Sequence, residues 1–259
     1  MSKGRIKDAF SGGKAFIPFI TGGDPDLAAT EKLLYTLRDA GADAIEIGIP
    51  FSDPIAEGPV IEAADERALR GGCTVDKLFG LVAGVSKDIG VPLLFMTYYN
   101  PVFVYGPEKF AERCGACGID ALIVPDLPFE ERGELLVHCD AAGVGLISLV
   151  SPTSEERIAK IAKNSEGFLY CVSSLGVTGE RGALGGEAKR MIEKAKAAAG
   201  IPCAVGFGIS APEQAREVAA FADGVIIGSA IVRIAAEHGR DCAAPVYEFA
   251  RSIKQAIGL

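Results

Sequence analysis

The amino-acid sequence predicts an α/β fold, and within that class a closed (β/α)8 barrel of the TIM type. Three observations predict it: apolar runs rich in β-branched residues alternate with longer amphipathic segments, eight such runs occur, and the chain of 259 residues suits the roughly 250 that eight βα units require. A doubly wound open sheet is the alternative, but its G-x-G-x-x-G fingerprint is missing after the first run. The eight candidate strands are 15–21, 44–50, 92–99, 121–126, 144–150, 167–173, 203–209 and 224–230.

The segments between these runs predict the helices, because apolar residues recur at helical spacing and most segments close on glycine. An extra helix is expected before the first strand. Clear helical segments lie at 26–42, 107–118, 128–143 and 211–222. No linker or low-complexity segment interrupts the pattern, so a single barrel domain over residues 1–259 is expected.

Two intervals between strand starts are longer than the others. The second and third starts are 48 residues apart, and the sixth and seventh are 36 apart. The extra residues predict long loops at 49–60 and 174–186, after the second and sixth strands. Because the loops after the strands form the active-site face of this fold, we expect function there.

Composition excludes several classes of protein. Lys and Arg number 26 against 34 Asp and Glu, a net charge of −8, which argues against a general nucleic-acid or anionic-membrane binder. The longest apolar runs, such as 144–150, are far shorter than the roughly 20 residues of a membrane span. The first ten residues contain no apolar segment of the kind that directs export.

The seven cysteines lie mostly inside apolar runs, which predicts reduced core thiols and a cytoplasmic protein. Cys114 and Cys117 form a C-x-x-C, but the pair closes a helical segment, whereas redox motifs of this kind open one. His138 and His238 are the only histidines, too few for a metal-ligand cluster, so no metal is expected.

Glu46 is the first candidate catalytic residue. Ile45, Ile47 and Ile49 alternate with smaller or charged residues, so strand geometry places the isoleucines on one face and Glu46 on the other. If the isoleucines pack under the helices, Glu46 points into the barrel near its carboxyl-terminal mouth. Burial there raises the pKa of a carboxyl, which suits proton exchange near neutral pH. A structural carboxylate paired with Lys or Arg is the alternative.

Two acidic residues of the loop after the second strand are further candidates. Glu57 lies eleven residues after Glu46 and is a possible second carboxylate over the same mouth, although an exposed loop Glu is usually only solvated. Asp53 precedes Pro54, a pairing typical of turns.

Glycines at three neighbouring strand ends predict a phosphate site. They are Gly176 and Gly179, the run 206–208, and Gly228 with Ser229. Ser229 is a candidate cap of a short helix whose amino terminus favours an anion, and this barrel class often binds phosphate after its seventh and eighth strands. No nucleophile pattern and no strand-end lysine occur, so the residues alone predict a metal-free lyase or isomerase acting on a phosphorylated small molecule.

Four segments carry a family resemblance: PFITGGDP at 18–25, IEIGIPFSDPIAEGP at 45–59, GVTG at 176–179 and GFGIS at 206–210. With these motifs in order, the chain resembles the tryptophan synthase alpha subunits from about Phe16 to its last helix. The resemblance implies retro-aldol cleavage of indole-3-glycerol phosphate to indole and glyceraldehyde 3-phosphate. Glu46 matches the family's catalytic glutamate. Glu57 matches a second catalytic carboxylate that is usually Asp and interacts with the indole N–H.

The resemblance also implies the binding residues. Tyr170 matches a tyrosine beside the reacting side chain, and the remaining matches fall into two groups. Phe19, Tyr98 and Ile123 match the indole pocket, with barrel core as the alternative for Ile123. Gly179, Gly208, Gly228 and Ser229 match positions that contact phosphate, and Thr178 matches a residue of the loop that closes over the site and orients Asp53.

The resemblance implies a partner, the beta subunit, in an α2β2 assembly. That subunit carries pyridoxal phosphate and receives indole through a tunnel, so no cofactor is expected in this chain. Asp53, Pro54 and Pro128 match the contact face. Three rivals stay open: indole-3-glycerol phosphate synthase, disfavoured because it relies on strand-end lysines; a free-standing indole-3-glycerol phosphate lyase; and a non-catalytic regulatory subunit that binds the phosphate ligand and only activates the beta enzyme.

Overall fold

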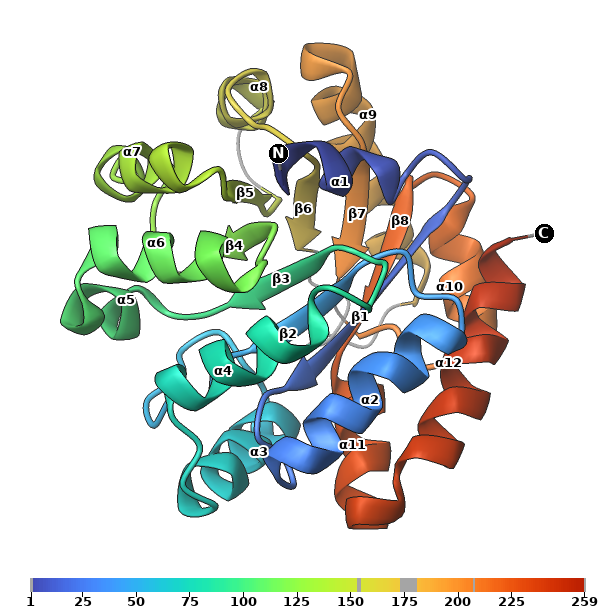
Figure 1. Ribbon diagram of the computed structural model, residues 1–259. Coiled ribbons are helices and arrows are strands. Elements are labelled where there is room, and N and C mark those ends of the chain that lie inside the picture. Colours follow the sequence, from blue (N-terminus) through green and yellow to red (C-terminus); the bar gives the residue numbers. More distant parts are fainter. Residues whose placement is uncertain (1, 153–154, 173–180, 207, 259) are drawn as a thin grey trace.

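The computed structural model describes residues 2–152, 155–172, 181–206 and 208–258 (Figure 1). In this part of the chain eight parallel strands pair in sequence order, and β8 pairs with β1 to close the barrel. The predicted (β/α)8 architecture is therefore confirmed. The strands are β1 (Ala15–Thr21), β2 (Ile45–Gly48), β3 (Leu93–Met96), β4 (Ala121–Ile123), β5 (Gly145–Val150), β6 (Leu169–Val172), β7 (Cys203–Gly206) and β8 (Gly224–Ile227).

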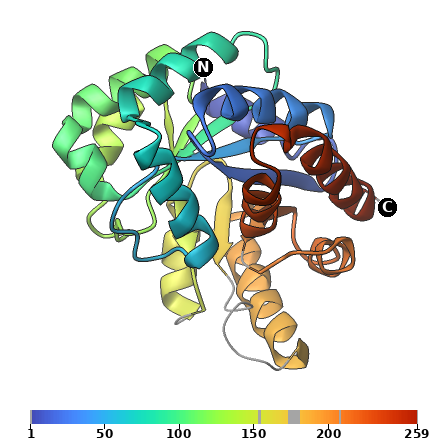
Figure 2. The same cartoon turned by 90° about the horizontal axis from the view of Figure 1, so that it is seen from below.

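The helices surround the strands on the outside, as Figures 1 and 2 show from two directions. The final helix α12 packs beside α2 on the outside of the barrel. The helices are α1 (Ser2–Asp8), α2 (Leu27–Asp39), α3 (Pro59–Arg70), α4 (Val75–Val85), α5 (Tyr99–Tyr105), α6 (Pro107–Cys117), α7 (Gly133–Ala142), α8 (Glu155–Lys163), α9 (Arg181–Ala199), α10 (Pro212–Ala219), α11 (Ser229–His238) and α12 (Ala243–Ile257), with a 3-10 turn η1 (Gly239–Asp241). No helix among the described residues is both long and apolar enough to cross a membrane.

The alternation of strand side chains divides the core into two parts. Ile45, Ile47 and Ile49 point outward and belong to the large core between strands and helices. Residues of the opposite parity, such as Ile17 and Leu94, fill the interior of the barrel. Because the period of a strand is two, this division fixes which residues of each strand can reach the barrel mouth.

Local signals in the sequence explain where several helices begin. The Asp26 carboxylate accepts a hydrogen bond from the Ala29 amide at 2.8 Å and caps α2. Proline at the first position of α3, α6 and α10 is compatible with a helix start, because the amide that it lacks has no partner within the helix. Left-handed glycines after α6 and α7 end those helices.

The predicted long loops are shorter than expected. The loop after β2 ends at Gly58, and the rest of the long interval forms a second helix, α3, before α4. The segment predicted as loop at 174–186 is helical from Arg181, the first residue of α9. Both predictions were wrong at the carboxyl-terminal side of the loop, because interval length alone does not distinguish a loop from an inserted helix. Helix α7 also begins five residues later than the segment 128–143 predicted.

The amino-terminal helix α1 covers the amino-terminal end of the barrel, as the extra helix of the prediction. Ile6 is buried in the interior core. The Phe10 ring, just after α1, lies 5.4 Å from that of Phe168, and the Arg5 guanidinium lies 3.3 Å from the Asp120 carboxylate. These contacts close one end of the barrel and leave the carboxyl-terminal end for a site.

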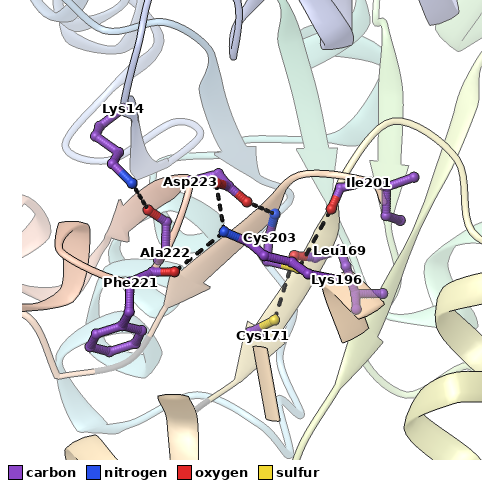
Figure 3. Close-up of polar contacts among 9 residues, drawn as sticks. All are labelled: Lys14, Leu169, Cys171, Lys196, Ile201, Cys203, Phe221, Ala222 and Asp223. Carbon is purple, nitrogen blue, oxygen red and sulfur yellow. Dashed lines mark hydrogen bonds and ion pairs between the residues drawn. The ribbon is translucent and has the colours of Figure 1, made fainter. Parts of the chain in front are cut away.

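A polar cluster joins α9 to β7 and β8 near this closed end (Figure 3). The Asp223 carboxylate lies 2.7 Å from Lys196 Nζ and accepts a hydrogen bond from the Cys203 amide at 2.9 Å. Lys14 Nζ donates to the Ala222 carbonyl at 2.6 Å. The loop before β8 is therefore fixed to three neighbouring elements.

All seven cysteines are buried and none forms a disulfide, as predicted for core thiols. Cys114 and Cys117 lie at the carboxyl-terminal end of α6, and burial raises the pKa of both thiols, that of Cys117 to about 11. Since the thiolate is the reactive form and little of it is present near neutral pH, this C-x-x-C is unreactive there.

We predict that Asp223→Ala lowers the free energy of unfolding by about 1–3 kcal/mol, because it leaves the Cys203 amide and the Lys196 ammonium without their carboxylate. Urea denaturation followed by circular dichroism measures the change. Glu217→Ala on the exposed face of α10 is the control and is expected to stay within about 0.5 kcal/mol of the wild type. Equal stability of the two variants would contradict a stabilising role for the cluster.

Candidate active site

Glu46 lies in the middle of β2, on the interior face of the barrel. Its Cα pairs with those of Phe19 on β1 and Leu94 on β3, and its side chain is fully buried. Among the described residues, neither of its carboxylate oxygens has a hydrogen-bond partner. Burial raises the pKa of Glu46 to about 8. The position predicted from the isoleucine alternation is confirmed, and no Lys or Arg pairs with it among the described residues.

Glu57 stands at the end of the loop after β2, two residues before α3. The side chain is half-buried, and its Oε2 atom is buried without a partner among the residues described. Burial, followed by the nearby Asp65 carboxylate, raises the pKa of Glu57 to about 7. Glu57 is therefore a partly desolvated acid and not the solvated loop carboxylate that its sequence context alone would suggest.

Tyr170 on β6 faces both carboxyls from across the barrel. It is 7% exposed, and burial, then Glu46 and Glu57, raise the pKa of its hydroxyl well above the usual value. Its ring lies over Gly206 of β7, where an added Cβ would come within 2.8 Å of Tyr170 Cε1. The Tyr170 ring fits at this place because Gly206 has no side chain. The structure brings Glu46, Glu57 and Tyr170 together.

A cavity of about 480 Å³ opens beside Tyr170. Its walls are mostly apolar, as expected for a site that holds an aromatic ring. The lining residues come from β3, β5 and β6, from the loops after β2, β4 and β5, and from α8. They include Ala56, Met96, Leu127, Pro128, Phe129, Leu149, Tyr170 and Val172, together with the charged Arg132 and Arg157.

The three residues matched to the indole pocket lie around this mouth, but none of them is among the residues that line the cavity. Phe19 packs between Gly48 and Gly228, where an added Cβ would come within 2.5 and 3.2 Å of its ring. Tyr98 Oη accepts a hydrogen bond from the Ala56 amide at 2.7 Å and so anchors the loop after β2. Ile123 is fully buried in the interior core, as its alternative interpretation expected.

The glycine loops differ in how much of them the structure describes. Gly176, Thr178, Gly179 and Phe207 lie outside the described residues. Gly208 is exposed with a φ of +69°, a conformation that favours glycine. Gly228, and not Ser229, is the N-cap of α11; Ser229 is its first residue, exposed, and no side-chain hydrogen bond caps the helix. The predicted capping by Ser229 was therefore wrong.

The residues matched to the partner face lie at the rim. Asp53 is exposed and Pro54 half-buried, and the Ser52 hydroxyl donates to the Asp53 carboxylate at 2.5 Å. Pro128 lines the cavity. Ile55, in the same loop, is 80% exposed, and Phe103 and Val104 of α5 are exposed as well. This apolar helix was missed because only seven residues form it, directly after β3.

Asp65 on α3 also escaped the sequence analysis. It is 5% exposed, and burial raises its pKa to about 7. The sequence contains a signal for it, because Asp65 shares the buried face of α3 with Ala64 and Ala68. A carboxyl on the inward face of a helix is a candidate site residue, but residues 59–60 were assigned to a loop and the helix was not recognised.

Comparison with known proteins identifies the family. The family model described as tryptophan synthase alpha chain matches residues 7–258. The tryptophan synthase alpha chain of Lacticaseibacillus casei is 44% identical over 99% of this chain and 97% of its own length, and that of Shouchella clausii is 51% identical over 88% and 85%.

Solved structures agree with this assignment. Tryptophan synthase subunit alpha from Legionella pneumophila has 40% identity and a TM-score of 0.85, covering 94% of this chain and 92% of that one. Mycobacterium tuberculosis tryptophan synthase gives 34% identity and a TM-score of 0.89 over 98% of both chains. The chain therefore belongs to the tryptophan synthase alpha chain family.

Proposed function

We propose that this chain cleaves indole-3-glycerol phosphate to indole and glyceraldehyde 3-phosphate by a retro-aldol reaction. The observation that carries the proposal is Glu46, a fully buried carboxyl without a hydrogen-bond partner among the described residues, in a chain of this family. Such a group is costly to bury unless it exchanges protons with a ligand.

Glu46 serves as acid and then as base. Its protonated form donates to indole C3, which places a positive charge on the ring. The resulting carboxylate removes the proton of the side-chain hydroxyl; the C–C bond electrons return to the ring, and the side-chain carbon leaves as an aldehyde. The carboxyl regains its proton within one cycle. A pKa of about 8 supports this double role, since both forms are accessible near neutral pH.

Glu57 and Tyr170 complete the catalytic group. Glu57 accepts the indole N–H and favours the positive charge on the ring; its pKa of about 7 leaves a carboxylate available at slightly alkaline pH. Glu is one methylene longer than the Asp usual in the family, so it reaches the ring from further back on the loop. Tyr170 lies beside the reacting side chain of the substrate. The position of Tyr170 near Glu46 and Glu57 supports this role.

The remaining site residues bind the substrate. The backbone amides at Gly208, Gly228 and Ser229 bind the phosphate, supported by the exposed amino terminus of the ten-residue helix α11. Gly179 and Thr178 join them from the loop after β6, outside the described residues. The cavity holds the indole ring. Phe19, Tyr98 and Ile123, which match the family's indole pocket, are buried outside its lining.

The chain acts within an α2β2 assembly with the tryptophan synthase beta subunit, which carries the pyridoxal phosphate and converts indole to tryptophan. This chain needs no cofactor and no metal of its own. The partner binds the rim at Asp53, Pro54 and Pro128, supported by the exposed Ile55 next to Pro54. We also propose one barrel domain over residues 1–259 and a cytoplasmic location, which is supported by seven cysteines that form no disulfide.

The first experiment measures glyceraldehyde 3-phosphate release from indole-3-glycerol phosphate with the purified chain, alone and with a tryptophan synthase beta subunit. We expect slow release that rises strongly when the partner is added, because loop closure excludes water and completes the site. Fast release without partner would favour the free-standing lyase. Activation of the beta enzyme without any release would favour the regulatory subunit.

We predict that Glu46→Gln lowers kcat of the cleavage by about 10²–10⁴-fold, the range for loss of a general acid–base group, and leaves substrate affinity nearly unchanged. Steady-state assays with the beta subunit and calorimetric titration of the substrate measure the two effects. Glu66→Gln, on the exposed face of α3, is the control and keeps wild-type activity. Loss of affinity equal to the loss of kcat would assign Glu46 a structural role instead.

A second prediction concerns stability and pH. Glu46 keeps its proton to about pH 8 when folded but loses it near 4.5 when unfolded, so between these values the native state binds more protons and stability falls as pH rises. Glu46→Gln removes this dependence and is expected to be more stable than the wild type by on the order of 3–5 kcal/mol above pH 8, with little difference near pH 5. Urea melts across this range measure it; a gap independent of pH would contradict the raised pKa.

A further inference from the structure

The cavity beside Tyr170 extends beyond the interior of the barrel. Its lining includes Leu149 and Tyr170 of the interior, but also Ile161 of the core between strands and helices. The register between β4 and β5 ends at Ile147, whereas β5 continues to Val150, so the cavity passes between the loop after β4 and the last residues of β5. Its volume of about 480 Å³ is in the range of sites for drug-sized ligands, and an indole ring fills only part of it.

Arg132, the residue directly before α7, lines the outer part of this cavity. Its guanidinium carbon lies 4.2 Å from the centroid of the Phe129 ring. The guanidinium donates to the Ser148 hydroxyl at 2.8 Å and to the Asn164 carbonyl. Ser148 has the parity of Leu146, which belongs to the outer core, so Arg132 meets β5 on its outer face. These contacts hold the planar group against the cavity wall.

The charge of Arg132 is only weakly compensated. Both acceptors of its described hydrogen bonds are neutral. Burial lowers the pKa of Arg132, and this effect exceeds the opposite effects of Glu166 and Asp140. Arg157, the other cation in the described lining, forms a bidentate pair with Glu130 at 2.8 and 3.0 Å. An anion in the cavity would therefore stabilise the Arg132 guanidinium.

Arg132 and Ser148 provide donors that suit a carboxylate. A guanidinium has several N–H donors in one plane, which matches the two oxygens of a carboxylate. The Ser148 hydroxyl accepts from Arg132, and this bond leaves its own hydrogen to donate. The neighbouring walls are apolar and include the side chains of Met96 and Leu149. The arrangement favours a ligand with an aromatic ring joined to a carboxylate.

We propose that Arg132 and the Ser148 hydroxyl form an anion subsite that binds the carboxylate of an aromatic acid, whose ring lies in the cavity toward Tyr170. An indole that carries a short carboxylate side chain is such a ligand. An aromatic amino acid binds less well, because its ammonium stands beside the carboxylate and close to Arg132. The binding does not depend on the proposed function, whereas competition with the substrate rests on it.

A fluorescence titration tests the subsite. The chain contains no tryptophan, so the emission of an indole probe is measured without a tryptophan background. Indole-3-acetate, indole-3-propionate and indole-3-butyrate are each titrated with the full-length chain and compared with the corresponding amide. We expect the best-fitting acid to bind about tenfold tighter than its amide. Tryptophan, which is indole-3-propionate with an added ammonium, is expected to bind more weakly than that acid. Equal affinity of acid and amide at all three lengths would overturn the proposal.

Substitution locates the carboxylate. Arg132→Met removes the charge and keeps the length of the side chain, so affinity for the acid falls about tenfold and affinity for the amide does not change. Arg251→Met is the matched control, because Arg251 also lies over an aromatic ring, that of Tyr247, and donates to its hydroxyl at 3.2 Å, but on α12. This control keeps the wild-type affinity. An unchanged affinity of Arg132→Met for the acid would contradict the assignment.

Two milder variants keep the test decisive if Arg132→Met does not fold. Arg132→Lys keeps the charge without the planar donors, and Ser148→Ala removes the hydroxyl alone. Each is expected to weaken binding of the acid severalfold and to leave the amide unaffected. Wild-type affinity of both variants for the acid would overturn the subsite.

The glycine loops after β7 and β8 are the alternative location for a carboxylate. Inorganic phosphate distinguishes the two, since it competes for those loops and not for a subsite at Arg132. We expect the acid to stay bound when phosphate is added. Displacement by phosphate, together with unchanged affinity of the Arg132 variants, would assign the carboxylate to the glycine loops and overturn the proposal.

Activity is measured last, with the beta subunit present. Because the ring of the acid and that of the substrate share the cavity, the acid is expected to raise KM for indole-3-glycerol phosphate and to leave kcat unchanged. Inhibition that does not compete with the substrate would overturn the placement of the ring. A wild-type chain that binds the acid through Arg132 and does not cleave the substrate would overturn the proposed function and leave the subsite standing.

Discussion

Closure of the eight-stranded parallel sheet is the constraint on which the site depends. A closed barrel has an inside and an outside, and every strand residue must belong to one or the other. On β2 the outside takes Ile45 and Ile47, which pack under the helices. Glu46 consequently has no route to solvent through the wall, and its carboxyl is desolvated by the same packing that stabilises the fold.

The interior is narrow, so glycines decide where large side chains fit. The Tyr170 ring uses the space over Gly206, and the Phe19 ring uses that between Gly48 and Gly228. These aromatic residues and glycines therefore form sterically coupled pairs across neighbouring strands. Outside the barrel wall, the bidentate Arg67–Asp24 pair at 2.8 Å ties α3 to the turn after β1 and thereby fixes the helix that follows Glu57.

The sequence predicted the fold and the main carboxyl because both follow from short-range periodicity. The eight strands are visible as apolar runs, and the parity of Glu46 follows from three isoleucines. Asp65 could not be found in this way, since its burial depends on an inserted helix. Ile123 was matched to the indole pocket by its position in the sequence, but the structure places it in the interior core. A sequence match cannot tell whether a side chain faces the cavity or the core, because this depends on packing.

The amino-terminal helix α1 restricts where substrate can enter and products can leave. Because Ile6, Phe10 and the Arg5–Asp120 pair close the amino-terminal end of the barrel, the substrate of the proposed reaction enters from the carboxyl-terminal end. A substrate that breaks in two there releases both fragments toward the same end of the barrel.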